Sequence, residues 1–365
     1  MRFLFQVLFY MICVSLVSGT NSGGVYEKID KTIAGIPESQ TTTVDQLGGY
    51  ISRTFNTPET RIRAVFVWIT GHIRYDVDNM QQTNYYEKEA DLPPVTLRIR
   101  KGVCMDYAAL FAALANKAGV KTYLVVGYTG IKGHVRMGMH AWCASRLTSG
   151  WYMFDPTWGA GYVLSGLFYY QRNENYYMIK PHEMIKTHIP FDPLWEFLNY
   201  PVDHAEFIHP ERWGGTKKVF FNFTDSIRVF EGLSPEIKLL SANRRIKAAG
   251  ITNTMVGDWV MNNEKQIKII HNKEVVDLYN DAVKSYNDGI SRMNDYVAYF
   301  NAHLNKPKEQ EMLSTILNDA ESLFNNANSK LNAITNPDDE TFQSVRTLKA
   351  SIGELLIRIR YKHRD

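Results

Sequence analysis

The sequence predicts an α+β domain followed by an antiparallel bundle of helices. Between residues 44 and 160, apolar residues first recur at helical spacing, and three segments rich in Val, Tyr and Trp follow, with turn residues between them. Helices that precede strands, rather than alternate with them, are typical of the α+β class. The residues from 266 to the end instead carry long apolar stripes at helical period, as expected for a bundle.

Length and composition limit the class of protein. The chain has 365 residues, which is enough for two domains with sizeable cores. Hydrophobic residues make up 45% and charged residues 22%, so a disordered chain is excluded, and three cysteines are too few for a disulfide-stapled fold. Lysines and arginines number 41 against 38 acidic residues, a net charge of +3 without any basic run. Nucleic acid and anionic lipid are therefore not expected as the main ligands.

Residues 1–19 are predicted to be a signal peptide. Arg2 precedes a mainly apolar run over 3–17, and Val17-Ser18-Gly19 offers small residues for cleavage. The alternative is an uncleaved membrane anchor, but this run is shorter than the roughly 18 to 20 residues that a membrane-spanning helix needs. We therefore expect an exported protein (periplasmic, on the cell surface or extracellular) with no membrane span after cleavage.

The elements of the first domain follow from where the apolar periods start and stop. Residues 20–45 lack a sustained period and are expected to be a linker. Glycines that follow a helical stripe mark helix ends, and glycines between Val-, Tyr- and Trp-rich runs mark turns. In order, we expect a helix over 62–71, a loop at 93–94, a helix from Cys104 to Gly119, and strands over 121–128, 140–147 and 151–158.

The rest of the chain is predicted to be helical. Residues 201–265 are expected to be a connecting region, in which Ser234 caps a helix that has Pro235 at its first position. Residues 266–365 are expected to form a three-helix bundle. We favour a bundle that buries its own stripes over one that keeps a groove open for a protein partner. The stripes cover 279–304, 313–334 and 342–359, with a break near Pro307 and a turn at 336–339.

Three residues of the first domain predict thiol chemistry. Cys104 opens a predicted helix, where unpaired backbone N–H groups and the helix dipole stabilise an anion such as a thiolate. A thiolate nucleophile needs a base beside it and a third group to orient that base. His140 begins a predicted strand, whereas His134 lies in a glycine-flanked stretch expected to be a mobile loop, so His140 is the favoured base. Asp155 ends the next predicted strand, and an antiparallel hairpin can set it beside His140.

Cys143 is expected to be a core residue. Strand alternation places Trp142 on the face of His140 and Cys143 on the opposite face. Because a buried free cysteine packs as a small apolar side chain, we favour this interpretation over a resolving cysteine or a disulfide partner.

Three blocks of sequence carry a resemblance to a known family. They are Arg100 to Ala108, His140-Ala141-Trp142 and Trp151 to Gly159. In residues and order they resemble the nucleophile, histidine and aspartate blocks of the transglutaminase-like superfamily, and residues 176–195 are similar to a segment of its kyphoscoliosis-peptidase-like members. The resemblance implies a papain-like catalytic domain over 46–200, with a Cys-His-Asp triad at Cys104, His140 and Asp155.

The resemblance also implies an oxyanion hole. One donor would be the backbone N–H of Cys104, and Trp68, which lies 36 residues upstream, is the positional candidate for a second. The alternative for Trp68 is a packed core residue. The sequence departs from the family at Cys143, where Asn or Asp is common, and at Glu196, where Gln is found. Neither position belongs to the triad.

These observations predict an exported cysteine hydrolase that acts on amide bonds of protein or peptide substrates. Such a triad requires no cofactor, and no metal is expected, because His182-Glu183 lacks the second histidine of a zinc-binding helix. Two alternatives stay open. In one, an amine replaces water and the protein is a crosslinking transglutaminase. In the other, the fold is a non-catalytic binding scaffold.

Overall fold

The computed structural model describes residues 23–86, 89–131, 134–213, 218–302 and 310–362. The predicted signal peptide and the predicted break at Pro307 lie outside these residues. The chain divides into two compact units, residues 1–263 and 264–365, and each is described by itself. The first combines helices with a sheet and the second is helical, which confirms the predicted fold class.

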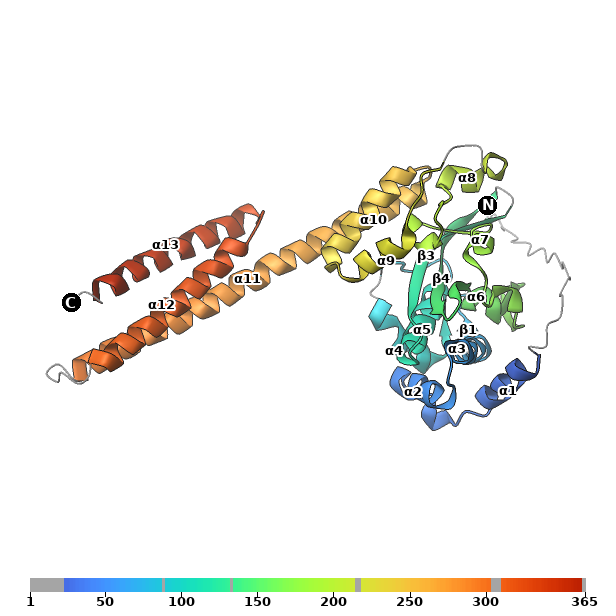
Figure 1. Ribbon diagram of the computed structural model, residues 1–365, viewed down its shortest axis with the longest axis horizontal. Helices are drawn as coiled ribbons and strands as arrows, with labels where there is room; N and C mark the ends of the chain where they lie inside the picture. The colour runs from blue at the N-terminus through green and yellow to red at the C-terminus, as the bar shows by residue number, and fades with distance from the viewer. Residues whose placement is uncertain (1–22, 87–88, 132–133, 214–217, 303–309, 363–365) are drawn as a thin grey trace, which may run out of the picture. The chain divides into compact units, whose positions relative to one another are not determined.

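A four-stranded antiparallel sheet with the order β5-β4-β3-β8 lies at the centre of the first unit (Figure 1). Its central strands are longer than predicted. Ile131 pairs with His134, so the ladder extends to described residues of the stretch expected to be a mobile loop. The strands are β3 (Thr122–Ile131), β4 (His134–Leu147), β5 (Gly150–Phe154) and β8 (His188–Pro190).

The third predicted strand ends four residues early. Strand β5 stops at Phe154, and the short helix α6 (Pro156–Ala160) begins directly afterwards. Asp155 caps this helix and Pro156 occupies its first turn, which is a common start for a helix. The site carboxylate is therefore held at a strand-to-helix junction.

Helix α5 (Cys104–Lys117) covers one face of the sheet. The two faces follow the predicted alternation, because Cys143 packs in the core on the α5 side and Trp142 packs in a core on the other side. Around α5 lie α2 (Val44–Thr54), α3 (Pro58–His72) and α4 (Leu92–Ile99).

The stretch 20–45 is not a linker. It contains helix α1 (Gly23–Ala34), which packs against α3. Helix α1 buries Ile29 and Ile33, and Asp30 forms an ion pair with the buried Arg63 at 2.8 Å. Two apolar positions one turn apart are too short a stripe to predict a helix from periodicity alone.

Residues 201–265 are likewise more than a connection. Helices α8 (His204–Ile208), α9 (Phe223–Glu231) and α10 (Pro235–Ala249) contribute Phe207, Ile227 and Ile246 to cores that include sheet residues. The Ser234 hydroxyl accepts a hydrogen bond from the N–H of Ile237, which confirms the predicted cap of α10.

Shorter elements complete the first unit. Strands β1 (Arg74–Tyr75) and β2 (Lys101–Gly102) pair in parallel, β6 (Gly161–Leu164) and β7 (Leu167–Tyr170) form a hairpin, and α7 (Pro181–Met184) precedes β8. Single 3₁₀ turns lie at Glu38–Gln40, Glu89–Asp91, Glu174–Tyr176, Pro193–Glu196 and Pro210–Arg212.

One residue of β3 allows no side chain. Gly127 lies between His140 of β4 and Pro190 of β8 in the ladder. A Cβ atom on Gly127 would stand 2.0 Å from the carbonyl oxygen of Ile189. Strand β8 therefore approaches β3 more closely than any other residue type would allow.

The second unit contains α12 (Gln310–Ala333), α13 (Asp339–Lys362) and most of α11 (Thr254–Ala302). The helices share a core whose buried members include Ala282, Phe324 and Ile352. Three residues of the predicted stripes, Val297, Phe300 and Phe342, are exposed. Among the described residues, no helix is both long enough and apolar enough to span a membrane.

Candidate active site

Cys104 is the first residue of α5, as predicted. The start of this helix is fixed by Asp106, whose Oδ2 accepts the N–H of Val103 at 2.8 Å. Gly102 leaves room for that carboxylate, because a Cβ there would lie 2.5 Å from Cβ of Asp106. The Cys104 side chain is 4% exposed, at the end of the helix where the backbone dipole favours negative charge.

His140 and Asp155 form a buried ion pair. Nε2 of His140 lies 2.7 Å from Oδ2 of Asp155, and the other carboxylate oxygen accepts the N–H groups of Thr157 and Trp158 at 2.9 and 3.0 Å. Burial raises the pKa of Asp155, but His140 and His188 outweigh this effect and hold the pKa well below its usual range. Asp155 is therefore ionised at neutral pH.

Cys104 lies close enough to His140 to affect the pKa of its imidazole. Burial lowers the pKa of His140, but the Asp155 carboxylate and the Cys104 thiol outweigh this effect and raise it to about 10. Because Nε2 faces Asp155, Nδ1 is the ring nitrogen left for the thiol. This geometry can pair a thiolate with an imidazolium.

Tyr85 is a neighbour of the thiol that the sequence did not predict. Its hydroxyl oxygen lies 3.2 Å from Sγ of Cys104, and the hydroxyl donates to the backbone carbonyl of Met139. The hydroxyl thus links Cys104 to the residue before His140.

His188 was also missed. It belongs to β8, its side chain is buried, and its Nε2 lies 3.2 Å from Oδ2 of Asp155. The sequence signal was weak, since a lone histidine beside Ile189 and Phe191 is equally typical of a core strand. Only pairing of β8 with β3 brings His188 to the carboxylate.

Aromatic rings enclose the histidines. The ring of His140 lies 5.1 Å from that of Trp158 and 6.2 Å from that of Trp142, while His188 contacts both indoles edge-on. These rings exclude water and so strengthen the electrostatic interactions around Asp155.

His140, Asp155 and His188 place ligand atoms within 4.8 Å of one another, a donor set that could also hold a metal ion. The hydrogen bonds from both imidazoles to Asp155 already account for this spacing. His182, the histidine weighed as a zinc ligand in the sequence, lies on the surface 3.4 Å from Glu183.

Residues 45–156 match the model of the transglutaminase-like superfamily, and this range contains Cys104, His140 and Asp155. The chain carries a transglutaminase-like domain. It is 32% identical over 194 residues to kyphoscoliosis peptidase of Homo sapiens, an alignment that covers 50% of this chain and 28% of that protein. It is 23% identical over 219 residues to hillarin of Drosophila melanogaster, which covers 54% of this chain and 26% of that protein. The chain therefore spans little more than a quarter of either relative's length.

The chain also resembles a solved structure, the periplasmic domain of TgpA from Pseudomonas aeruginosa. The two share 22% sequence identity at a TM-score of 0.26, over 36% of this chain and 48% of that one.

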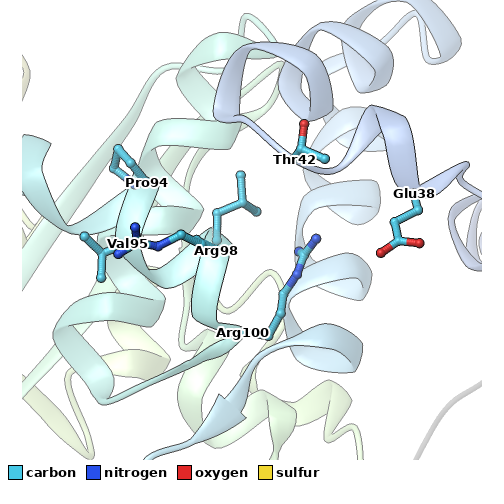
Figure 2. A pocket seen from close by; sticks show the side chains of 7 residues that line it. Glu38, Thr42, Pro94, Val95, Arg98 and Arg100 are labelled. Atoms are coloured by element: carbon cyan, nitrogen blue, oxygen red, sulfur yellow. The ribbon is translucent and has the colours of Figure 1, made fainter.

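Trp68 of the transglutaminase-like domain is buried in the same core cluster as Cys104. Its ring stacks on His72 with centroids 4.8 Å apart, and the Arg100 guanidinium lies 4.6 Å from it. Arg100 in turn lines a pocket of about 580 Å³, shown in Figure 2, whose lining includes none of Cys104, His140 and Asp155. A role for Trp68 in the oxyanion hole stays a prediction.

The second cysteine of the transglutaminase-like domain behaves as a core residue. Cys143 is buried and free, and its thiol donates to the backbone carbonyl of Ala108 in α5 at 3.2 Å. Burial raises the pKa of Cys143 well above its usual value. This thiol is therefore inert at neutral pH.

Proposed function

We propose that the protein is an exported cysteine hydrolase that cleaves amide bonds of protein or peptide substrates. The observation that carries the proposal is the buried His140–Asp155 pair. Cys104, at the N-terminus of α5, contributes to the raised pKa of the His140 imidazole. Such a constellation activates a thiol as a nucleophile. The name peptidase on the human relative supports hydrolysis over amine transfer.

The reaction would begin with attack of the Cys104 thiolate on the substrate carbonyl carbon. The oxyanion that forms would accept a hydrogen bond from the backbone N–H of Cys104. The His140 imidazolium would give its Nδ1 proton to the leaving amine as the C–N bond breaks, which leaves a thioester. Water would then lose a proton to His140 and attack the thioester carbonyl, and the C–S bond would break, which releases the acid product and restores the Cys104 thiolate. Asp155 would hold the imidazole in place throughout.

Alkylation of Cys104 by iodoacetamide at pH 7 tests the activated thiol. Wild-type protein should react at Cys104 and not at Cys143, and His140→Ala should slow the reaction about tenfold or more, because an unassisted thiol is only a few per cent ionised. Asp155→Asn should slow it less than His140→Ala does. Cys104→Ala is the control for reaction elsewhere.

The same experiment can reject the proposal. Equal labelling of Cys104 and Cys143, unaffected by loss of His140, would mean that no activated pair exists, and the binding-scaffold interpretation would replace the hydrolase. Turnover of an unstructured protein substrate in the presence of a primary amine distinguishes the hydrolase from the transglutaminase. Hydrolysed product supports the hydrolase, and amine-labelled product supports the transglutaminase.

Export is part of the proposal. Cleavage after the small residues Val17-Ser18-Gly19 should leave a mature chain that starts near Thr20. Mass spectrometry of the protein recovered from its native host should find this terminus outside the cytoplasm. Recovery of the intact Met1 species from the membrane fraction would contradict export.

A further inference from the structure

Two imidazoles share one oxygen of the Asp155 carboxylate. Nε2 of His140 lies 2.7 Å and Nε2 of His188 lies 3.2 Å from Oδ2. The mechanism proposed above uses only the first of them. His188 is 1% exposed and Asp155 is fully buried, so the contact is shielded from bulk solvent.

The carboxylate of Asp155 is saturated with donors. Oδ1 accepts two backbone N–H groups, from Thr157 and Trp158, and Oδ2 faces two imidazole nitrogens. An ionised carboxylate offers about four acceptor positions, so each one has a partner. Rotation of the carboxylate away from His140 would break bonds on both oxygens.

Thr187 is the partner of the other ring nitrogen of His188. Its hydroxyl oxygen lies 2.8 Å from Nδ1 of His188 and 3.4 Å from the carbonyl of Met184. The Thr187 hydroxyl can act as donor or as acceptor toward Nδ1. Because the ionised Asp155 carboxylate can only accept, the Nε2 of His188 that faces it carries a ring proton.

We propose that His188 is a positioning residue of the site, which donates from Nε2 to Oδ2 of Asp155 and thereby holds the carboxylate aimed at His140. The inference rests on the proposed function, since it assigns a role toward the same triad. It adds a chain of hydrogen bonds that links Thr187 through His188 to Asp155.

A purely structural role for His188 makes a different prediction. The ring also packs edge-on against Trp142 and Trp158, at 5.2 and 4.7 Å between centroids, and this packing alone would stabilise the fold. Loss of packing would lower the melting temperature and leave the chemistry of the folded fraction unchanged. Loss of positioning would change the pH dependence of Cys104 reactivity.

The test compares His188→Leu and His188→Gln in the full chain by the pH profile of iodoacetamide labelling at Cys104. Leucine fills space without a donor, whereas glutamine can present an N–H close to the Nε2 position. We expect His188→Leu to label about tenfold more slowly at pH 7, the effect of losing one hydrogen bond to a charged group. The pH profile of its labelling, summarised by its midpoint, should also differ from that of the wild type. His188→Gln should recover most of both effects.

His182→Leu, a change at an exposed histidine of the same domain, is the matched control and should alter neither rate nor midpoint. Besides His140 and His188, the titratable groups that act on or feel the Asp155 charge are Tyr75 and Cys143, and all variants retain them. Wild-type rates and midpoints in His188→Leu would overturn the inference. If His140→Ala labels as fast as wild type, the proposed function fails instead, so the two failures are distinguishable.

A second measurement does not depend on the variants folding. In wild-type protein labelled with ¹⁵N-histidine, nitrogen spectra report which ring nitrogen of His188 carries hydrogen. We expect a proton on Nε2, because the ionised Asp155 carboxylate can only accept. An unprotonated Nε2 in the wild type would contradict donation to Asp155 and overturn the inference.

Discussion

The charge state of the candidate site results from a competition at single residues. Burial opposes charge on both His140 and Asp155, but each provides the opposite charge that the other needs. The folded pKa of Asp155 is therefore below its usual value, and that of His140 is raised to about 10. The pair carries charge over the whole physiological range.

This competition predicts how stability depends on pH. A lowered folded pKa at Asp155 stabilises the fold above about pH 4, and the contribution is lost as pH falls. A raised folded pKa at His140 stabilises the fold fully below about pH 6.5, and the contribution is lost as pH rises toward 10.

Asp155→Asn should accordingly cost about 3 kcal/mol of unfolding free energy near pH 5 to 6, and less as pH approaches 10. Urea unfolding of both proteins across this range checks the expectation. Asp225→Asn, which removes one partner of an exposed ion pair, should cost less than about 0.5 kcal/mol throughout. A cost at Asp155 that grows above pH 7 would contradict the assignment.

Tyr85 supplies a second prediction that concerns a single residue. Its hydroxyl proton is committed to the Met139 carbonyl, so its oxygen can only accept the S–H of Cys104 and favours the neutral thiol. Tyr85→Phe should therefore speed iodoacetamide labelling of Cys104 roughly two- to tenfold, the value of one neutral hydrogen bond. Tyr86→Phe, at the exposed neighbour, should leave the rate unchanged. Slower labelling of Tyr85→Phe would show that the hydroxyl instead stabilises the thiolate.

Single residues also mark the limit of what the sequence could predict. The contact between His140 and Asp155 was predictable, because a short hairpin joins β4, which carries His140, to β5, which ends directly before Asp155. Tyr85 and His188 were not. Each reaches the site through a loop or a strand pairing that no local pattern specifies.

At the scale of elements, the start of α5 positions the nucleophile. Asp106 accepts the N–H of Val103 and receives a hydrogen bond from the Thr96 hydroxyl of α4 at 3.3 Å. The carboxylate thus ties the first turn of α5 to the neighbouring helix.

Asp106→Ala should cost about 1 kcal/mol of unfolding free energy and slow Cys104 labelling, because the first turn of α5 would lose its cap. Thermal melting and alkylation rates measure the two effects. Asp91→Ala is a matched control, since Asp91 precedes α4 but makes no side-chain capping bond. An Asp106→Ala protein that melts and labels like Asp91→Ala would show that the cap is dispensable.

Elements with long periods or recognisable caps were predictable from the sequence. Helix α5 and the capped α10 lie where the sequence placed them. Helix α1 and the helices of 201–265 were missed as parts of the core, because each buries only a few apolar residues and depends on packing against distant segments.

At the scale of the whole molecule, the second unit has a core of its own. Expressed alone, residues 264–365 should give a strongly helical circular dichroism spectrum and melt cooperatively. Phe324→Ala should destabilise this fragment by about 3 to 5 kcal/mol, because the ring is fully buried and packs against Gly289.

Phe342→Ala, at a residue that is 52% exposed, should change the stability of the same fragment far less. A random-coil spectrum of the fragment would mean that its stripes need the rest of the chain in order to fold.

The close approach at Gly127 has a consequence for how substitutions are tolerated. A methyl group there would force β8 away from β3, and β8 carries His188. The carboxylate of Asp155 would lose a donor although no polar atom had been removed. A survey of all single substitutions should therefore record a loss of reactivity at a position that has no functional group of its own. The positions that do not tolerate substitution would therefore include residues that set the spacing of the strands, as well as residues whose side chains take part in the chemistry.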